Sequence, residues 1–442
     1  MHSPLTHPCA LRSFVRVCDI PRADEDGTIH TNPKRKRGRA LHPRLRFGLV
    51  SASPACGIFS VPLDGSLPTD LFCLLNGYDL MTELPVPEAN LPAGDVLAAV
   101  SETPAPVPAT SGPSKKPPVS DGKVWVGFDL GGTKMSAVLF DRKFEAIARR
   151  RKKTRGSDGV EAGLERIRSV IDKLLEESQV PRDRLGGIGI GCPGPLDLDE
   201  GVILELPNLG WKNVPLKKLL EKEFGCPVFL SNDVDAGVYG EYRFGAAVGA
   251  RTVLGVFPGT GIGGGLVYND SIYRGKRTSC LEIGHVLVVS DGPLCGCGRR
   301  GCLETVASRL AMSAEIAKAA YRGQAPQILR IAGTDLANIR SGTIKEAIEK
   351  GDEVVEQIVR DGARHLGTAI AGAVNLLLPD VIVLGGGLVE ALPKLYLEEV
   401  GKTIIKHIMP SFQKTYELKV AKLGDDAGAM GAAAWARRCV EQ

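Results

Sequence analysis

Two glycine-rich turns, each lying between two short apolar runs, restrict the fold of this chain more than any other feature of its sequence. The first turn, 129–134 (Asp-Leu-Gly-Gly-Thr-Lys), follows the apolar run 124–128 and precedes a second run, 135–140. The second turn, 259–265, also lies between two apolar runs. Runs of β-forming residues joined by glycines predict hairpins. Because the plan occurs twice, we expect two related α/β domains that share one phosphate site.

Elsewhere in the folded part, stretches with helical spacing of apolar residues alternate with short apolar runs. This alternation is typical of α/β domains. The predicted strands are 185–191, 228–230 and 381–384, and the predicted helices are 164–175, 216–224, 308–321, 344–350, 354–378 and 427–438.

The first 122 residues have a different composition. Of the 29 prolines, 17 lie before Lys123, and residues 88–118 mix Pro, Ala, Ser and Lys without an apolar period. The basic run 34–37 fits a nucleic-acid-binding or targeting segment, but it also fits a solvated disordered run, which we favour. We therefore expect residues 1–122 to form a disordered or low-complexity extension.

Charge and cysteine content restrict the partners and the compartment. The net charge of +4 on 442 residues gives no reason to expect nucleic acid or a membrane as a partner. No apolar run is long enough to cross a bilayer. An odd number of cysteines, 11, indicates reduced thiols and a metal site rather than a disulfide framework. These features predict a cytoplasmic protein.

Asp233 is the strongest candidate for a general base. It follows Asn232 directly after the predicted strand 228–230, and ligands of open α/β sheets bind at the carboxyl ends of strands. A carboxylate there can accept a proton from a hydroxyl group that the neighbouring amide orients. An Asn-Asp pair is also common in ordinary turns. The two glycine turns favour the first interpretation, because phosphoryl transfer needs phosphate positioning and one base.

A second cluster of polar residues offers ligands for a metal ion. Cys295, Cys297 and Cys302, with His285 ten residues before the first of them, provide three thiolates and one imidazole. This is the ligand set of a closed structural zinc site, which we favour over a catalytic zinc and over three unrelated cysteines. Such a site would hold Glu282 and Glu304, which flank it, in one geometry. Both glutamates could accept hydrogen bonds from a polyol, although each could also be an ordinary surface residue.

In order along the chain, these motifs resemble the signature segments of the ROK family of sugar kinases and repressors. The resemblance covers residues from about Val124 onward, and the cysteine segment is its most specific part. Segments 240–245, 304–308 and 424–428 look most like the ATP-dependent bacterial glucokinases of the family. One departure is Val234-Asp235, where relatives usually have Ala-Asn. The segments that carry the resemblance are 129–134, 191–195 (Gly-Cys-Pro-Gly-Pro), Asn232-Asp233, 259–265, 282–285 (Glu-Ile-Gly-His) and 295–304.

The resemblance implies an α/β protein with the actin-like ATPase (ribonuclease H-like) fold, in which two α/β domains surround a cleft. The smaller domain would comprise residues 123–232 and be completed by the C-terminal helix 427–438. The larger domain would comprise residues 233–426 and carry the zinc-binding segment. The resemblance also implies a homo-oligomer, either a dimer or a tetramer.

The resemblance further implies that Asp233 takes the proton from the 6-hydroxyl of a hexose while the γ-phosphate of ATP is transferred. ATP would bring Mg²⁺, and the structural ion would be Zn²⁺. The sugar would be held by Gly194, Asn208, Asn232, Asp233, Glu282, His285 and Glu304; ATP by Gly131, Gly132, Thr133, Lys134, Thr260, Gly261, Gly386 and Gly387; and zinc by His285, Cys295, Cys297 and Cys302.

Three kinds of function remain compatible with these motifs. The first is a hexose kinase of carbohydrate metabolism and glycolysis that prefers glucose. The second is a kinase for fructose, N-acetylglucosamine, N-acetylmannosamine or allose. The third is a sugar-responsive transcriptional regulator or binding protein. The intact Asp233 and glycine turns favour a kinase, and the proline-rich extension lacks the paired helices of a DNA-binding module. Polyphosphate is an alternative donor, but family members that use it generally lack the zinc cysteines.

Overall fold

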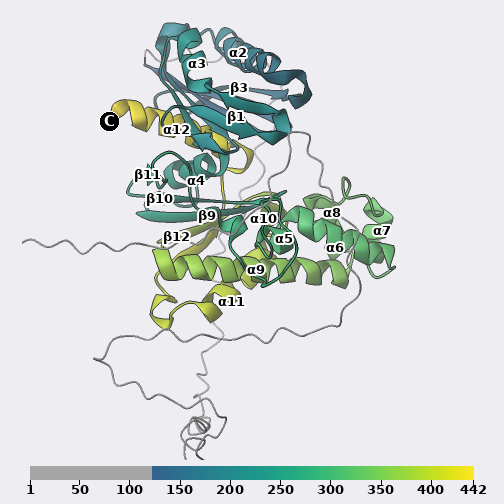
Figure 1. The fold of residues 1–442 in the computed structure, drawn as a ribbon. Coiled ribbons are helices and arrows are strands. Elements are labelled where there is room, and N and C mark those ends of the chain that lie inside the picture. Colours follow the sequence, from purple (N-terminus) through teal and green to yellow (C-terminus); the bar gives the residue numbers. More distant parts are fainter. Residues whose placement is uncertain (1–121) are drawn as a thin grey trace, which may run out of the picture. The chain divides into compact units, whose positions relative to one another are not determined.

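The computed structural model describes residues 122–442, so residues 1–121 of the predicted extension lie outside the described part. Two five-stranded sheets form the framework, and both hairpins predicted around the glycine turns are confirmed (Figure 1). In each sheet one strand of the hairpin also pairs in parallel with a later strand. The first sheet has the order β3-β2-β1-β4-β8, with β1 (Val124–Leu130), β2 (Lys134–Phe140), β3 (Ala146–Lys153), β4 (Leu185–Cys192) and β8 (Val228–Asn232).

The second sheet repeats the central part of this arrangement. Its order is β11-β10-β9-β12-β13, and a separate three-stranded sheet has the order β5-β6-β7. The strands are β9 (Thr252–Pro258), β10 (Ile262–Tyr268), β11 (Ser271–Ile272), β12 (Val381–Leu384) and β13 (Glu417–Val420) in the second sheet, and β5 (Leu196–Asp197), β6 (Val202–Leu206) and β7 (Trp211–Val214) in the third.

The second glycine turn is shorter than the sequence predicted. Only residues 259–261 connect β9 to β10, and the last three glycines of the motif lie inside β10. A Cβ atom at Gly263 would lie 2.4 Å from Val234 Cγ2, and one at Gly264 would lie 2.7 Å from Leu281 O. The glycines of β10 therefore allow neighbouring segments to approach the strand closely, rather than forming the turn.

Two amphipathic helices cover the first sheet, as the sequence predicted. Helix α2 (Gly159–Glu177) buries an apolar stripe that includes Ile167 and Ile171, and α3 (Leu216–Phe224) buries Leu220. All three side chains are fully buried in the core that also contains β1 and β4. Apolar residues at helical spacing on one face explain why these two helices could be recognised from the sequence.

Helices α4 (Asp233–Phe244) and α12 (Ala427–Glu441) pack closely against one another, since a Cβ atom at Gly240 would lie 2.4 Å from Ala427 O and the rings of Tyr239 and Trp435 lie 5.3 Å apart. Helix α12 also packs on β1 and β4. A Cβ atom at Gly127 would lie 1.9 Å from Ala429 O, and one at Gly189 would lie 1.8 Å from Ala432 O. The glycines of β1 and β4 and the alanines of α12 therefore permit close packing of a helix on the sheet.

Buried Glu241 connects α4 to the segment that precedes α12. Its Oε1 accepts hydrogen bonds from the backbone N–H groups of Lys422 (2.8 Å) and Leu423 (2.7 Å). Its Oε2 accepts a third from the N–H of Ala246, at 2.7 Å. Glu241 is 0% exposed, so these three donors satisfy a carboxylate that has no access to water.

The remaining helices pack around the second sheet and share one apolar core with it. Among helices in residues 122–442, none combines the length and apolar character needed to cross a bilayer. The helices of this core are α5 (Glu304–Ala307), α6 (Arg309–Tyr321), α7 (Pro326–Ala332), α8 (Ser341–Glu349), α9 (Glu353–Leu377), α10 (Gly387–Ala391) and α11 (Pro393–His407).

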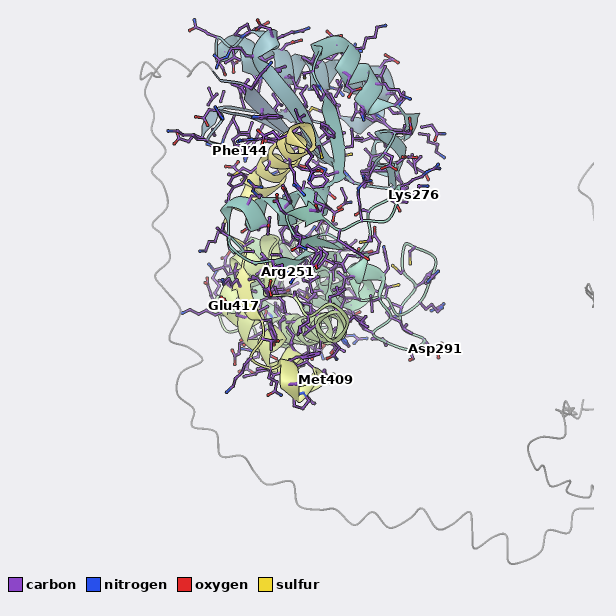
Figure 2. The ribbon with its side chains drawn as sticks, turned by 90° about the vertical axis from the view of Figure 1, so that its left-hand side faces the viewer. Phe144, Arg251, Lys276, Asp291, Met409 and Glu417 are labelled. Atoms are coloured by element: carbon purple, nitrogen blue, oxygen red, sulfur yellow. The ribbon has the colours of Figure 1, made fainter. Side chains whose placement is uncertain are left out.

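Figure 2 shows Phe144 beside α12, where the guanidinium of Arg437 lies 5.6 Å from the centre of the Phe144 ring.

Candidate active site

The candidate site begins at the carboxyl ends of three parallel strands in the first sheet. The strand register places Asp129 of β1 opposite Gly191 of β4, and Gly191 opposite Ser231 of β8. Asn232 ends β8, and Asp233 is the first residue of α4. The sequence predicted the strand end but not the helix that starts there. This edge of an open α/β sheet is where ligands usually bind.

Asn232 is the N-cap of α4, and this fixes the direction of its side chain. Its Oδ1 accepts hydrogen bonds from the backbone N–H groups of Val234 (2.9 Å) and Asp235 (3.3 Å). Asp233 Oδ1 also accepts from Val234 N, at 3.0 Å. Because the oxygen of Asn232 serves the helix end, the amide N–H₂ is the part of this side chain that could meet a ligand.

Two carboxylates at this strand edge, Asp129 and Asp233, have raised pKa values. Burial raises the pKa of Asp233; the hydrogen bond from Val234 opposes that shift, and the charge of Glu282 adds to it. Burial also raises the pKa of Asp129 to about 6, and the charge of Asp233 adds to this shift while Lys134 opposes it. A carboxylate with a raised pKa is a better proton acceptor than an exposed one.

The first glycine turn is closed by hydrogen bonds. Gly131 N donates to Lys134 O at 3.0 Å, and Thr154 Oγ1 donates to Gly131 O at 2.7 Å. Asn208 lies beside this turn, since a Cβ atom at Gly132 would lie 3.3 Å from Asn208 Cβ. Lys134 Nζ lies 3.3 Å from Asp425 Oδ2 in an exposed ion pair, so its charge has a partner within the chain.

The second glycine turn lies beside Glu304 and Arg309. Glu304 Oε2 accepts a hydrogen bond from Ile262 N at 3.0 Å, and it would lie 2.4 Å from a Cβ atom at Gly261. Arg309 donates through Nη2 to Thr260 Oγ1 at 2.8 Å, and through its backbone N–H to Gly259 O at 2.9 Å. The turn therefore has a carboxylate on one side and a guanidinium on the other.

The glycines after β12 lie next to the second turn. Gly386 has a φ of 86°, in the region that favours glycine, and a Cβ atom there would also lie 2.6 Å from Pro258 O. Pro258 directly precedes the turn residue Gly259. Exposed Gly387 begins α10. The segments predicted to contact phosphate and adenosine are thus adjacent in the second sheet.

The four predicted zinc ligands form one cluster. The ligand atoms of His285, Cys295, Cys297 and Cys302 all lie within 4.8 Å of one another. Cys295 Sγ lies 3.5 Å from His285 Nδ1, and Cys297 Sγ lies 3.7 Å from Cys302 Sγ. A tetrahedral ion with Zn–S bonds of about 2.3 Å separates its sulfur ligands by about 3.8 Å, so the spacing of these residues fits zinc.

The surroundings of the cluster favour thiolate at one of its cysteines. A backbone hydrogen bond from Arg299 is the main cause that lowers the pKa of Cys297, whereas burial raises the pKa of Cys302 to about 11. Cys295 Sγ lies 3.9 Å from Glu304 Oε1. The cluster therefore adjoins the same glutamate that contacts the second glycine turn.

Other predicted contacts have no direct counterpart in the described residues. No hydrogen bond within residues 122–442 joins the turn 131–133 to the turn 259–261, so a shared phosphate site stays a prediction. Gly194 is exposed at the corner after β4, two residues beyond Cys192, which pairs with Asn232. This corner lies near the strand edge, but its contact with a sugar also stays a prediction.

Three candidate residues were missed by the sequence reasoning. Asp129 was passed over as part of a glycine turn, although it is the only ionisable residue in the otherwise apolar strand β1. Arg309 follows the cap residue Ser308 and could have been noticed as a cation at a helix start. Asp425 was noted only within segment 424–428, and nothing local indicated its ion pair with Lys134, which lies 291 residues away in the sequence.

Comparisons with known proteins bear on the family and the fold of the chain. The ROK family matches residues 125–439. The glucokinase of Thermotoga maritima is 34% identical over 310 residues, which cover 70% of this chain and 95% of the glucokinase. A putative xylose repressor of a Caldicellulosiruptor species is 30% identical over 309 residues, which cover 70% of this chain and 77% of the repressor.

Solved structures give the same result. A ROK family glucokinase from Streptomyces griseus, solved in complex with glucose and AMPPNP, is 31% identical and superposes with a TM-score of 0.62. The superposition covers 71% of this chain and 99% of that glucokinase. The predicted family and fold are thereby confirmed. The chain belongs to the ROK family and has the actin-like ATPase fold.

Proposed function

We propose that this protein is an ATP-dependent hexose kinase that transfers the γ-phosphate to the sugar 6-hydroxyl, with glucose as the preferred sugar. The observation that carries the proposal is the environment of Asp233, a buried carboxylate with a raised pKa at the carboxyl ends of three parallel strands. The glucokinases of Thermotoga maritima and Streptomyces griseus support the choice of reaction and sugar.

In this proposal Asp233 accepts the proton of the sugar 6-hydroxyl as that oxygen attacks the phosphate. The raised pKa supports this role, because it makes the carboxylate a stronger base. The amide N–H₂ of Asn232 would donate to a neighbouring sugar hydroxyl, since its oxygen already caps α4. Glu282 and Glu304 would accept hydrogen bonds from further hydroxyls, with Asn208, His285 and Gly194 completing the pocket.

The two glycine turns would hold the phosphates of ATP from opposite sides. Gly131 to Lys134 would contribute from the first sheet, and Thr260 and Gly261 from the second, while Gly386 and Gly387 would approach the adenosine. The Asp129 carboxylate suits Mg²⁺, which prefers oxygen ligands and would neutralise charge on the phosphates. The phosphates would compete with Asp425 for the Lys134 ammonium.

The cysteine cluster would support the sugar pocket mechanically. Zinc held by His285, Cys295, Cys297 and Cys302 would stabilise the segment that carries Glu282 and Glu304. The contact between Cys295 and Glu304 supports this coupling. A closed set of four protein ligands supports a structural ion rather than a catalytic one.

A sugar-responsive regulator is the second candidate, because repressors also occur among the relatives. The extent of the matches favours the kinase: the match spans 95% of the Thermotoga maritima glucokinase but 77% of the xylose repressor. The unmatched part of the repressor is therefore larger, and the regulator shares less of its length with this chain.

The test is ADP release by the full chain from ATP and Mg²⁺ across a panel of hexoses and N-acetylhexosamines. We expect the highest turnover with glucose, and a fall of about three orders of magnitude in Asp233→Asn with glucose binding retained. The matched control is Asp361→Asn, the same substitution at an exposed residue of α9, and this variant should keep full turnover. Tight glucose binding without ADP release in the wild type would refute the kinase and leave the regulator.

A further inference from the structure

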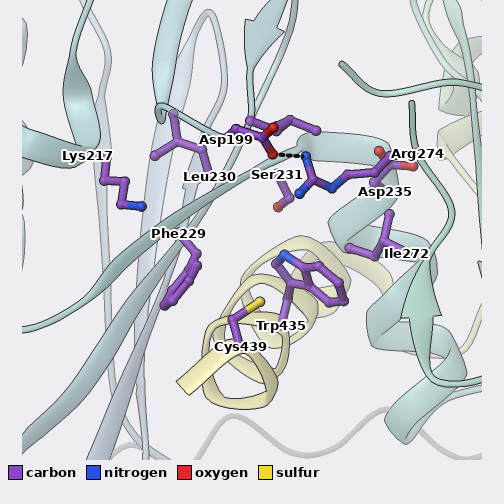
Figure 3. Close-up of a pocket in the computed structure, with 11 residues that line it drawn as sticks. Asp199, Lys217, Phe229, Leu230, Ser231, Asp235, Ile272, Arg274, Trp435 and Cys439 are labelled. Atoms are coloured by element: carbon purple, nitrogen blue, oxygen red, sulfur yellow. Dashed lines mark ion pairs between the residues drawn. The ribbon is translucent and has the colours of Figure 1, made fainter. Parts of the chain in front are cut away.

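A cavity distinct from the candidate active site lies on the other side of the β8–α4 connection. Its volume is about 220 Å³. It is lined from both sheets: by Ser231 on β8, Lys217 on α3 and Trp435 on α12, and by Arg274 just beyond β11 (Figure 3). None of these residues belongs to the predicted sugar, nucleotide or zinc sites. The proposed reaction therefore assigns no ligand to this cavity.

Asp235 gives this cavity an unsatisfied acceptor. The residue is 1% exposed and lines the cavity. Its Oδ2 accepts a hydrogen bond from Ser279, but no donor within residues 122–442 reaches its Oδ1. A buried carboxylate oxygen without a donor is costly, and Asp235 is one of the polar residues that line the cavity. Burial raises the pKa of Asp235 to about 7, as expected for such an environment.

Lys217 supplies a free positive charge on the opposite side of the cavity. Its ammonium lies 5.7 Å from the centre of the Phe229 ring, and none of the ion pairs within residues 122–442 includes it. The neighbouring cation, Arg274, is already paired with Asp199 at 3.0 Å. Figure 3 shows Lys217 on one side, facing the Trp435 ring and the Asp199–Arg274 pair on the other.

These groups define the chemistry of a ligand. An ammonium without a carboxylate partner favours an anionic group, and the Ser231 hydroxyl and Asp235 carboxylate favour hydroxyls. The Trp435 ring offers an apolar face on which the C–H side of a sugar ring can pack. The volume of about 220 Å³ lies below the roughly 300–1,000 Å³ usual for drug-sized ligands, so a nucleotide would be too large.

We propose that this cavity binds a monosaccharide phosphate, with the phosphate at Lys217, the hydroxyls at Ser231 and Asp235, and the sugar ring against Trp435. The proposal goes beyond the kinase reaction and does not require it, because the cavity would recognise this ligand whether or not the chain produces it.

Residues that would contact a ligand in this cavity are separated from Asp233 by only a short stretch of chain. Asp235 lies two residues after Asp233 on α4, and Ser231 lies two residues before it on β8. The segment after β5 of the three-stranded sheet also contacts the segment after β11 of the second sheet beside the cavity: Leu198 N donates to Arg277 O at 2.7 Å near the Asp199–Arg274 pair. A bound sugar phosphate would strengthen this junction and stabilise one relative position of the two sheets.

The test is an equilibrium titration of the full chain with glucose 6-phosphate, followed by tryptophan fluorescence. Trp435 is the one of the three tryptophans that lines the cavity, whereas Trp125 and Trp211 are 4% and 1% exposed elsewhere. Saturating glucose is present to occupy the sugar site, and ATP is omitted. We expect a saturable fluorescence change with glucose 6-phosphate, none with further glucose, and at least tenfold weaker binding of inorganic phosphate.

Lys217→Ala should weaken the binding of glucose 6-phosphate about tenfold or more, since it removes the charged partner of the phosphate. Lys218→Ala is the matched control on the same helix; Lys218 pairs with Glu200, and its loss should leave the affinity unchanged. Equal affinity in Lys217→Ala and wild type, or no saturable change at all, would overturn the proposal. So would equal binding of inorganic phosphate and glucose 6-phosphate. The titration involves no turnover, so a protein that binds but does not phosphorylate glucose would refute only the proposed function.

Discussion

Replacing Glu241 by Gln should destabilise the protein more than any change of similar size at its surface. The two oxygens of Glu241 accept three backbone N–H groups, and the side chain is 0% exposed. A glutamine has one oxygen and one N–H₂ group. If its oxygen faces Lys422 and Leu423, its N–H₂ group faces the N–H of Ala246, and two donors then oppose each other without an acceptor.

The expected loss follows from this geometry. A lost hydrogen bond to a charged group, which also leaves a buried donor unsatisfied, costs about 3 kcal/mol. For a chain of this size, that corresponds to a fall of roughly 4 °C in the midpoint of thermal unfolding. The other orientation of the amide is worse, because it leaves two N–H groups unsatisfied instead of one.

The assay is thermal unfolding of the full-length variant followed by circular dichroism, with urea unfolding as a second measurement. Glu346→Gln is the control. It is the same substitution, but Glu346 is an exposed residue of α8 that forms an ion pair with Lys350. That change should cost less than about 1 kcal/mol. A Glu241→Gln variant that unfolds within 1 °C of the control would show that the three hydrogen bonds are not needed, and the reasoning would fail.

Three further predictions concern other parts of the chain. Cys297→Ser should lower both the zinc content, measured by elemental analysis, and the unfolding temperature; unchanged zinc content would contradict the proposed ligand set. Arg309→Ala should raise the KM for ATP about tenfold while leaving the KM for glucose unchanged, whereas Arg322→Ala at the other end of α6 should change neither. Because burial raises the pKa of Asp235 to about 7, the folded state loses stability as the pH rises from about 4 to 7. Asp235→Asn should therefore be about 4 kcal/mol more stable than wild type at pH 8 and nearly equal to it at pH 4 in urea unfolding; an equal difference at both pH values would contradict this.

The hairpins and the amphipathic helices could be predicted because their signals are local. Apolar runs on both sides of a glycine-rich turn identify β1–β2 and β9–β10, and the stripe on α2 has helical spacing. Most of the predicted zinc site could also be recognised from a local pattern, since three of its four ligands lie within eight residues of sequence. Such patterns reflect short-range physics, and one sequence is enough to read them.

Other elements gave no such signal. Helix α4 contains Gly237 and Gly240, which have low helix propensity. Gly240 allows the close contact with α12, and Gly237 lies against Phe257 of β9. Strand β3 is rich in arginine and lysine because it is an edge strand of the first sheet. The length of the second turn was overestimated, since glycines that serve packing and glycines that serve turns look alike in a sequence.

The position of α12 affects the order in which the protein can fold during synthesis. The helix packs on β1 and β4, although about 300 residues separate it from β1 in the chain. When the first sheet leaves the ribosome, the backbone of Gly127 and Gly189 therefore has no helix to cover it. This face of the nascent sheet must therefore remain uncovered, and open to chaperones or to aggregation, until α12 has been synthesised.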